Sequence, residues 1–529
     1  MLRTMYSRRH HIPFFAVLLA SACQMLGAAE STGRNGYNVR DYGATGDGKT
    51  LDSPAINRAI EAAAKAGGGT VVVTAGTYLS GSIRMKSNIN LLIDAGATIL
   101  GAPQKMNAYD ETEPVTVAGS GFQDGGHTYF HNSLIWGENL KNVSITGNGM
   151  IHGGGLERND DILNKLCGHD SWDNPEKASK EPFKPLRLGN KAIALKLCSN
   201  VLLRDVTIVH GGHFAILTTG CDNMTMDNLT IDTNRDGIDI DCCRNVTVSN
   251  CRVNSPGDDA ICPKSTYALG RPVITENLTI TNCQVSGFKE GTLLDGTMVP
   301  VKNGNGRIKF GTESSGGFRN CTVSNSTFRG CRGLALEEVD GGILENITIS
   351  NLSMMDAQTY AIYIVTGSRN RTPGLKTVSR MKNILISNVV ATGVDRVSGI
   401  QIAGLPEQPI EGLRLENIRL IGNGGGTREH AANVPMELGN GYPEPRQHNI
   451  MPAYGLFARH VKGLELANIN VSFLKDDFRH AIQCVDVKGL EIDNFKARLA
   501  EGVVASKFEN VPDPVIRNSP QLQQQAAGL

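Results

Sequence analysis

The chain has 529 residues, which exceeds one ordinary hydrophobic core, so it should form several domains or one architecture built by repetition. Sixty glycines and 40% hydrophobic residues exclude a disordered scaffold. Because 52 basic residues balance 52 acidic ones, no net charge attracts nucleic acid or an anionic membrane, and any charged ligand must be bound locally.

The N-terminal residues are typical of an export signal. Three arginines precede an apolar run from Ile12 to Ala22 that is too short to span a bilayer. Cleavage before Cys23 would place a lipid anchor on that cysteine, and cleavage near Ala28 or Ala29 is the alternative. We expect a signal peptide over residues 1–29, no membrane span, and a mature protein that is periplasmic, outer-membrane lipid-anchored or extracellular.

A short helix is predicted from the segment SPAINRAIEAAAKAGGG. Ser53 can cap it, Pro54 fits its first position, and alanine-rich residues continue it to about Ala66. Gly67 to Gly69 then end it.

A sequence motif of alternating apolar and polar residues recurs along the chain, as in SNVLLRDVTI, DNMTMDNLTI and RNVTVSNCRV. This alternation indicates strands with one buried face. The leading Asn200, Asn223 and Asn245 are spaced 23 and 22 residues apart, a period that indicates a solenoid. The fold predicted for residues 38–515 is therefore an all-β, single-stranded parallel β-helix with asparagines stacked at its turns, covered by the N-terminal helix. Residues 516–529 are predicted to be a flexible tail.

Twelve cysteines in an exported protein suggest disulfides. However, Cys198, Cys221, Cys243 and Cys251 fall in or beside the repeats, where a cysteine can stack as a small apolar residue. Both interpretations stay open.

Aspartates gather in the stretch from Ile231 to Ser265. Asp236 lies 22 and 23 residues before Asp258 and Asp259, which is one coil, so the three side chains should stack about 4.8 Å apart. Like charges at that range raise the pKa of at least one carboxyl group, and that asymmetry suits acid-base hydrolysis of a glycosidic bond. Asp239 and Asp241 alternate with isoleucines and are expected to face outward as solvated residues. A calcium site is the alternative use of such a cluster; hydrolysis is preferred, with no metal or cofactor.

NRDGIDID and, one coil later, SPGDDAICPKS resemble the paired aspartate motifs of glycoside hydrolase family 28, the polygalacturonases and rhamnogalacturonases that cut pectin. NVRDYGATGDGKTLDSPAINRAI resembles the N-terminal entry of the same proteins. The resemblance extends from about Asn38 to Phe473. It implies a right-handed, pectin lyase-like β-helix that hydrolyses with inversion, with Asp258 as the general acid and with Asp236 and Asp259 holding the attacking water.

Two family motifs are altered. The Gly-His-Gly motif aligns with GNGRIKFG and puts Asn305 in place of the histidine, and the Arg-x-Lys pair aligns with Ala335 and Glu337. In a rival alignment Arg307 and Lys309 are themselves that pair. The first alignment implies a site that disfavours galacturonate beyond the cleaved bond and fits a neutral sugar such as rhamnose.

The cations that remain as candidate partners for a substrate carboxylate are Lys264, Lys289, Arg307, Lys309, Arg369 and Arg371. The long gap between repeats from Gly412 to Gly463 predicts loops that wall the groove and close one end, which would favour removal of terminal residues.

The sequence thus predicts an exported, monomeric glycoside hydrolase that acts on galacturonan or rhamnogalacturonan and binds no nucleic acid. Two alternatives remain: a calcium-dependent pectate lyase on the same scaffold, and a non-catalytic glycan-binding β-helix.

Overall fold

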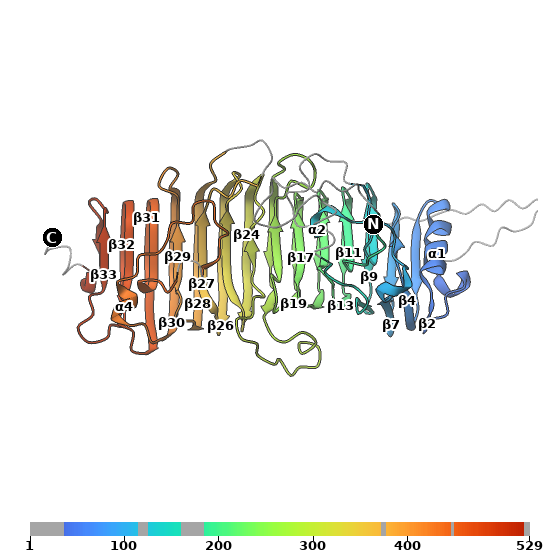
Figure 1. The fold of residues 1–529 in the computed structure, drawn as a ribbon, viewed down its shortest axis with the longest axis horizontal. Helices are drawn as coiled ribbons and strands as arrows, with labels where there is room; N and C mark the ends of the chain where they lie inside the picture. Colours follow the sequence, from blue (N-terminus) through green and yellow to red (C-terminus); the bar gives the residue numbers. More distant parts are fainter. Residues whose placement is uncertain (1–35, 115–124, 160–184, 372–376, 446–448, 523–529) are drawn as a thin grey trace, which may run out of the picture. The chain divides into compact units, whose positions relative to one another are not determined.

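The recurring sequence motifs form short strands, and each strand pairs in parallel with the strand one repeat further along the chain (Figure 1). The register follows the sequence spacing, since Val201 pairs with Met224 and Met224 pairs with Val246. The computed structural model describes residues 36–114, 125–159, 185–371, 377–445 and 449–522. The signal peptide predicted over residues 1–29 lies outside these ranges.

The strands stack in three columns, one for each face of the coil. The first column consists of β1 (Tyr37–Asn38), β3 (Gly69–Val73), β6 (Ile89–Ile93), β9 (Lys141–Thr146), β12 (Ser199–Arg204), β15 (Asp222–Asp227), β18 (Arg244–Ser249), β21 (Thr275–Thr281), β24 (Gly317–Arg329), β26 (Ile343–Met355), β28 (Arg380–Val394), β30 (Ile410–Gly424), β31 (Ala453–Lys475), β32 (His480–Ala497) and β34 (Val515–Arg517). The second consists of β2 (Asp47–Leu51), β4 (Gly76–Ser80), β7 (Ala97–Gly101), β10 (Met150–His152), β13 (Thr207–Val209), β16 (Thr230–Asp232), β19 (Arg252–Asn254) and β22 (Gln284–Ser286), and it joins β24.

The third column carries the aspartate-rich stretch. It consists of β5 (Ile83–Arg84), β8 (Ile135–Glu138), β11 (Ile193–Lys196), β14 (Phe214–Thr219), β17 (Asp236–Asp241), β20 (Ile261–Lys264), β23 (Lys309–Phe310), β25 (Arg332–Glu338), β27 (Gln358–Thr366) and β29 (Ile400–Ala403), continued by β31, β32 and β33 (Ser506–Glu509). The chain is therefore a parallel β-helix, as the repeats predict.

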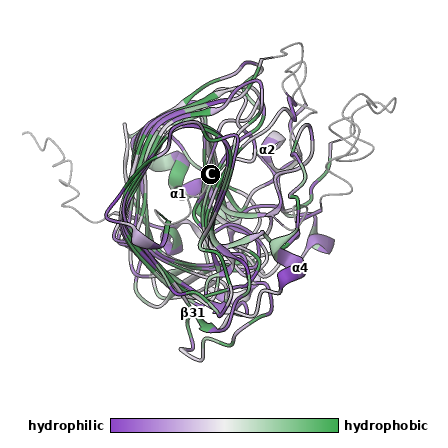
Figure 2. Ribbon diagram, turned by 90° about the vertical axis from the view of Figure 1, so that its left-hand side faces the viewer, coloured by the Kyte–Doolittle hydropathy of each residue, from purple (hydrophilic) through white to green (hydrophobic). Residues whose placement is uncertain are grey.

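Helices are few and short among the described residues. α1 (Ser53–Lys65) is accompanied by α2 (Gly125–Thr128), α4 (Arg428–Ala431) and two 3₁₀ turns, η1 (Val39–Tyr42) and η2 (Gln104–Met106). In the view along the stack, α1 lies inside the outline of the coils, whereas α2 and α4 lie outside it on one side (Figure 2). Buried residues of α1, among them Ile56 and Ile60, belong to the main core, so the helix closes the N-terminal end.

The expected capping role of Ser53 is wrong. The helix already includes Ser53, whose hydroxyl instead accepts a hydrogen bond from the N–H of Gly81 at 3.1 Å. Asp52 occupies the N-cap position, and its carboxylate accepts the N–H groups of Thr45 and Gly46. Asp52 thus ties the preceding loop to the start of the helix.

The interior of the coils is filled by inward-facing aliphatic residues. Val246, Leu278 and Ile347 are among the core residues with no more than 2% exposure, and burial of each such side chain contributes about 1.5–3 kcal/mol. Outside, asparagines stack at the turns as predicted. Asn142 and Asn200 have φ near +56° and are joined by a side-chain hydrogen bond of 2.9 Å, which compensates for the left-handed backbone conformation.

Ten cysteines lie in the described part of the chain, and all are unpaired and buried. Cys221 and Cys243 stack on consecutive coils, with the Cys221 N–H donating to the Cys243 sulfur at 3.3 Å. For these ten cysteines the stacked interpretation is therefore correct.

The C-terminal boundary extends beyond residue 515. Arg517 pairs with Asp493 in the sheet, and Leu522 is fully buried in the core, so residues 516–522 are folded rather than a tail. None of the helices in the described ranges combines the length and the apolar character that crossing a bilayer requires.

Candidate active site

Three carboxylates meet on the third column. Asp236 begins β17, and Asp258 and Asp259 end the turn before β20, one coil later. One carboxylate oxygen of each lies within 4.8 Å of the others, and the N–H of Asp259 donates to Asp236 Oδ1 at 2.9 Å. Asp236 and Asp259 are buried, whereas the side chain of Asp258 is 22% exposed. The spacing of one coil therefore brings the three acids together, with Asp258 nearest to solvent.

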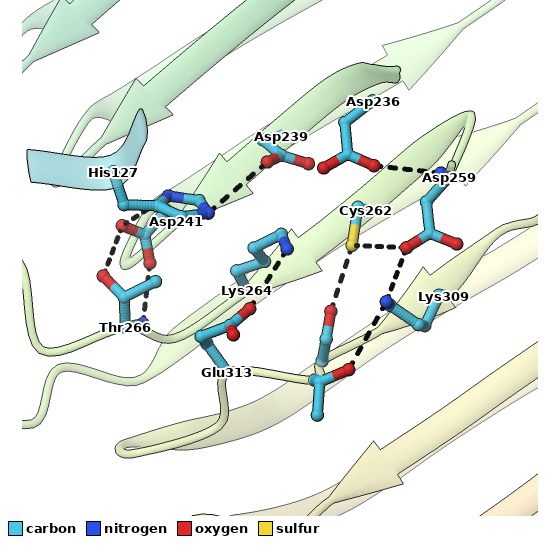
Figure 3. A network of polar contacts seen from close by, with 12 residues as sticks. His127, Asp236, Asp239, Asp241, Asp259, Cys262, Lys264, Thr266, Lys309 and Glu313 are labelled. Atoms are coloured by element: carbon cyan, nitrogen blue, oxygen red, sulfur yellow. Dashed lines mark hydrogen bonds and ion pairs between the residues drawn. The ribbon is translucent and has the colours of Figure 1, made fainter. Parts of the chain in front are cut away.

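The two buried carboxyl groups have opposite charge environments. Burial, and then the negative charge of Asp258, raise the pKa of Asp236 to about 7. Burial would also raise the pKa of Asp259, but Arg307 and Lys309 outweigh it and hold that pKa below its ordinary value. Lys309 Nζ lies 2.5 Å from one oxygen of Asp259 (Figure 3). Arg307 Nε lies 2.6 Å from the other oxygen. Asp259 is thus ionised at neutral pH, while Asp236 titrates there.

The raised pKa of Asp236 predicts how the free energy of unfolding depends on pH. An unfolded aspartate loses its proton near pH 4, whereas folded Asp236 keeps its proton to about pH 7. Between these values the folded state binds more protons, so the free energy of unfolding falls as the pH rises. Asp236→Asn removes this loss, and we expect its stability relative to the natural protein to grow between pH 4 and 7 by on the order of 4 kcal/mol.

Denaturant unfolding at pH 4, 5.5 and 7.5 measures this effect. Asp476→Asn, at an exposed position, serves as the control and should show no such trend. A stability difference for Asp236→Asn that is independent of pH would contradict the prediction.

Asp258 is paired with its neighbour from the preceding coil. Arg235 Nη1 lies 2.6 Å from Asp258 Oδ2, and Arg235 Nη2 lies 3.4 Å from His213 Nε2. His213, Arg235 and Asp258 are separated by 22 and 23 residues, so they occupy one row across three coils. The spacing that identifies the aspartates would also have identified Arg235 and His213, which the sequence analysis missed.

The expectation that Asp239 and Asp241 are solvated is wrong. Both point away from the core, yet both are fully buried, because other segments cover them (Figure 3). His127 of α2 lies 3.7 Å from Asp239, and Thr266 donates its N–H and hydroxyl to Asp241 at 2.8 and 2.7 Å. Burial, followed by the charge of Asp236, raises the pKa of Asp239 well above its ordinary value. Both residues are therefore structural partners beneath the site.

The other predicted substrate contacts are scattered. Lys264 is buried and paired with Glu313 at 3.1 Å. Arg369 is paired with Asp340, and Arg371 is half buried beside it. Lys289 is exposed on the segment after β22.

Asn305 is half buried beside the acids. Its N–H donates to the carbonyl of Pro256 at 2.9 Å, so it joins the turn that carries Asp258.

Other segments of the protein cover the outward face of the coil on the C-terminal side of the three aspartates. Ala335 and Glu337 face outward from β25 but are fully buried, since Ala335 packs with Tyr360 and Leu438, and Glu337 is bound by Thr312. Thr312 Oγ1 donates to Glu337 at 2.9 Å and lies 3.1 Å from the Tyr442 hydroxyl. Glu444 accepts from Arg332 at 2.9 Å. The outward face of β25, one coil beyond Lys309, is therefore covered by protein.

Several known proteins are similar to this chain in sequence and in fold. The profile of a family described as "Rhamnogalacturonase A/epimerase, pectate lyase-like" matches residues 36–261. A probable polygalacturonase of Vitis vinifera is 24% identical over 403 residues, which are 72% of this chain and 73% of that protein. An exo-poly-alpha-D-galacturonosidase of Dickeya chrysanthemi is 24% identical over 392 residues, 66% of this chain and 61% of that protein.

Among solved structures, an exopolygalacturonase from Thermotoga maritima superimposes with a TM-score of 0.55 at 23% identity, over 73% of this chain and 87% of that chain. The predicted fold class, a right-handed parallel β-helix, is thereby confirmed. Both of these curated relatives carry the names of glycoside hydrolases. The chain is therefore similar in sequence, at 24% identity, to a probable polygalacturonase and to an exo-poly-alpha-D-galacturonosidase.

Proposed function

We propose that the protein hydrolyses α-glycosidic bonds of galacturonan or rhamnogalacturonan with inversion. The observation that carries the proposal is the meeting of Asp236, Asp258 and Asp259 within 4.8 Å, with Asp258 nearest to solvent. Asp258 donates a proton to the leaving oxygen, and Asp236 and Asp259 hold the attacking water. The names of the relatives, polygalacturonase and exo-poly-alpha-D-galacturonosidase, support a pectic substrate.

We further propose that the enzyme acts on chain ends. Tyr360 and Leu438 pack over the outward face of β25 on the C-terminal side of the acids, which supports a site that a polysaccharide cannot cross on that side. A groove closed at one end accepts a terminus more readily than an internal segment.

Incubation with homogalacturonan and with rhamnogalacturonan tests both statements. We expect one of the two to yield small saturated products from the first time points, with the anomeric configuration inverted. Early release of long fragments would contradict action at chain ends. Unsaturated products that disappear with a chelator would support the calcium-dependent lyase instead.

The lyase remains the second candidate because the three carboxylates also have the geometry of a cation site. The positive charges beside the three carboxylates disfavour binding of a divalent cation there. Arg235, Arg307 and Lys309 already supply three positive charges to these carboxylates, which leaves little net attraction for a divalent ion. Binding of oligosaccharide with no bond cleavage would support the non-catalytic alternative.

We also propose that the mature protein is exported and acts as a monomer. The arginines and the apolar run within residues 1–29 support export. Fractionation of the producing cells, with a Cys23→Ser variant to detect lipid anchoring, tests this proposal.

A further inference from the structure

Of the three cations paired with the site carboxylates in the described residues, only Arg235 reaches solvent. Arg307 and Lys309 are 1% and 3% exposed and bind both oxygens of Asp259. The side chain of Arg235 is 16% exposed and touches Asp258, itself 22% exposed. A ligand that reaches Asp258 can therefore also contact the Arg235 side chain.

His213 orients this guanidinium. It is fully buried, and its ring packs against Phe214 with centroids 4.3 Å apart. Its Nδ1 lies 3.4 Å from the carbonyl oxygen of Arg158, so Nδ1 carries the proton and Nε2 accepts from Arg235. The arginine is thus held between His213 and Asp258, with its side chain partly exposed.

Among the described residues, the side chains of the cations Lys264, Lys309 and Arg369 on the C-terminal side of the site are buried and paired with protein carboxylates. The positions aligned with the family's Arg-x-Lys pair hold Ala335 and Glu337, both fully buried. The cations Lys264 and Arg369 form ion pairs with Glu313 and Asp340. Recognition of an acidic sugar therefore falls to the Asp236 side, where Arg235 lies.

We infer that Arg235 is the receptor for a uronate carboxylate of the substrate, and that this carboxylate displaces Asp258 from the guanidinium as the sugar docks. The guanidinium fork matches a carboxylate with two N–H groups. A carboxylate that loses its cationic partner binds a proton more readily, so docking of an acidic sugar prepares Asp258 to act as an acid. The inference rests on the hydrolase function proposed above, and it names a uronate as the sugar bound beside Asp258.

The test compares two forms of whichever pectic oligosaccharide the natural protein cleaves, the native form and the form with its carboxyl groups reduced to alcohols. We expect the natural protein to prefer the native form by at least about 30-fold in kcat/KM, and Arg235→Gln to lower that preference about 10- to 100-fold. Turnover of the reduced form should stay equal or rise, because Asp258 is no longer paired. Arg235→Lys should recover part of the preference.

Arg244→Gln is the matched control, since Arg244 forms an Arg–Asp pair of 2.7 Å with Asp222 on another face of the next coil. It should leave both rates unchanged. An Arg235→Gln variant that keeps the preference within threefold, or that loses both rates equally, would overturn the receptor role and leave the hydrolase function standing. Failure of the natural protein to cleave either polysaccharide would instead overturn the proposed function.

Discussion

Asp258→Asn should abolish turnover while the protein stays folded. Removing a general acid lowers kcat by about 10²–10⁴-fold. The asparagine oxygen can still accept the N–H of Asp259, which now lies 3.1 Å from Asp258 Oδ1. The ion pair lost with Arg235 is partly exposed, so the free energy of unfolding should change by no more than about 1 kcal/mol.

Release of reducing ends and the midpoint of denaturant unfolding measure the two effects separately. Asp222→Asn is the matched control, because Asp222 is also partly exposed and paired with an arginine, 2.7 Å away. Its activity should equal that of the natural protein. Near-normal turnover by Asp258→Asn would remove Asp258 from the role of acid.

The sequence predicts the site well where the repeat itself sets the geometry. A coil of about 22 residues converts spacing into contact, which is why Asp236, Asp258 and Asp259 meet as expected. The same rule covers Arg235 beside Asp258, although a basic residue next to a catalytic acid carries no signal of its own in a composition of balanced charge.

The rule fails where distant segments fold over the coils. Asp239 and Asp241 face outward as the alternation predicts, yet α2 and Thr266 bury them. Ala335 is likewise covered by Leu438, about a hundred residues further along the chain. Strand periodicity fixes which way a side chain points, but it contains no information about which loop will cover it.

Arg307→Met should destabilise the protein strongly. Asp259 is fully buried, so the loss of one of its two cations leaves a poorly compensated charge, which lowers the free energy of unfolding by about 3–5 kcal/mol. Arg307 Nη1 also lies 3.4 Å from Glu337 Oε1, and that carboxyl group would lose this ion pair while keeping its hydrogen bond from Thr312. The matched change at the surface, Arg244→Met, should lower stability by about 1 kcal/mol or less.

The deficit of Arg307→Met should depend on pH. Because the natural protein holds the pKa of Asp259 below its ordinary value, the stabilisation is present above that ordinary value and is lost as the pH falls through the folded-state pKa. The difference from Arg307→Met should therefore be large at pH 7 and should shrink most as the pH falls below about 4. Denaturant unfolding across this range measures it, and a difference independent of pH would contradict the pairing.

The double variant Arg307→Met with Asp259→Asn decides what the Arg-Ile-Lys segment does. If Arg307 and Lys309 serve as counter-ions of Asp259, neutralising the aspartate should recover a large part of the lost stability, a coupling of 2 kcal/mol or more on the scale of about 0.5–3 for contacting residues. If they are instead the family's substrate-gripping pair, Arg307→Met should raise KM with little loss of stability, and the double variant should recover nothing. The contacts of 2.5 and 2.6 Å to Asp259 and the near-complete burial of both cations favour the first outcome, because a side chain already bound and covered has little left to offer a sugar.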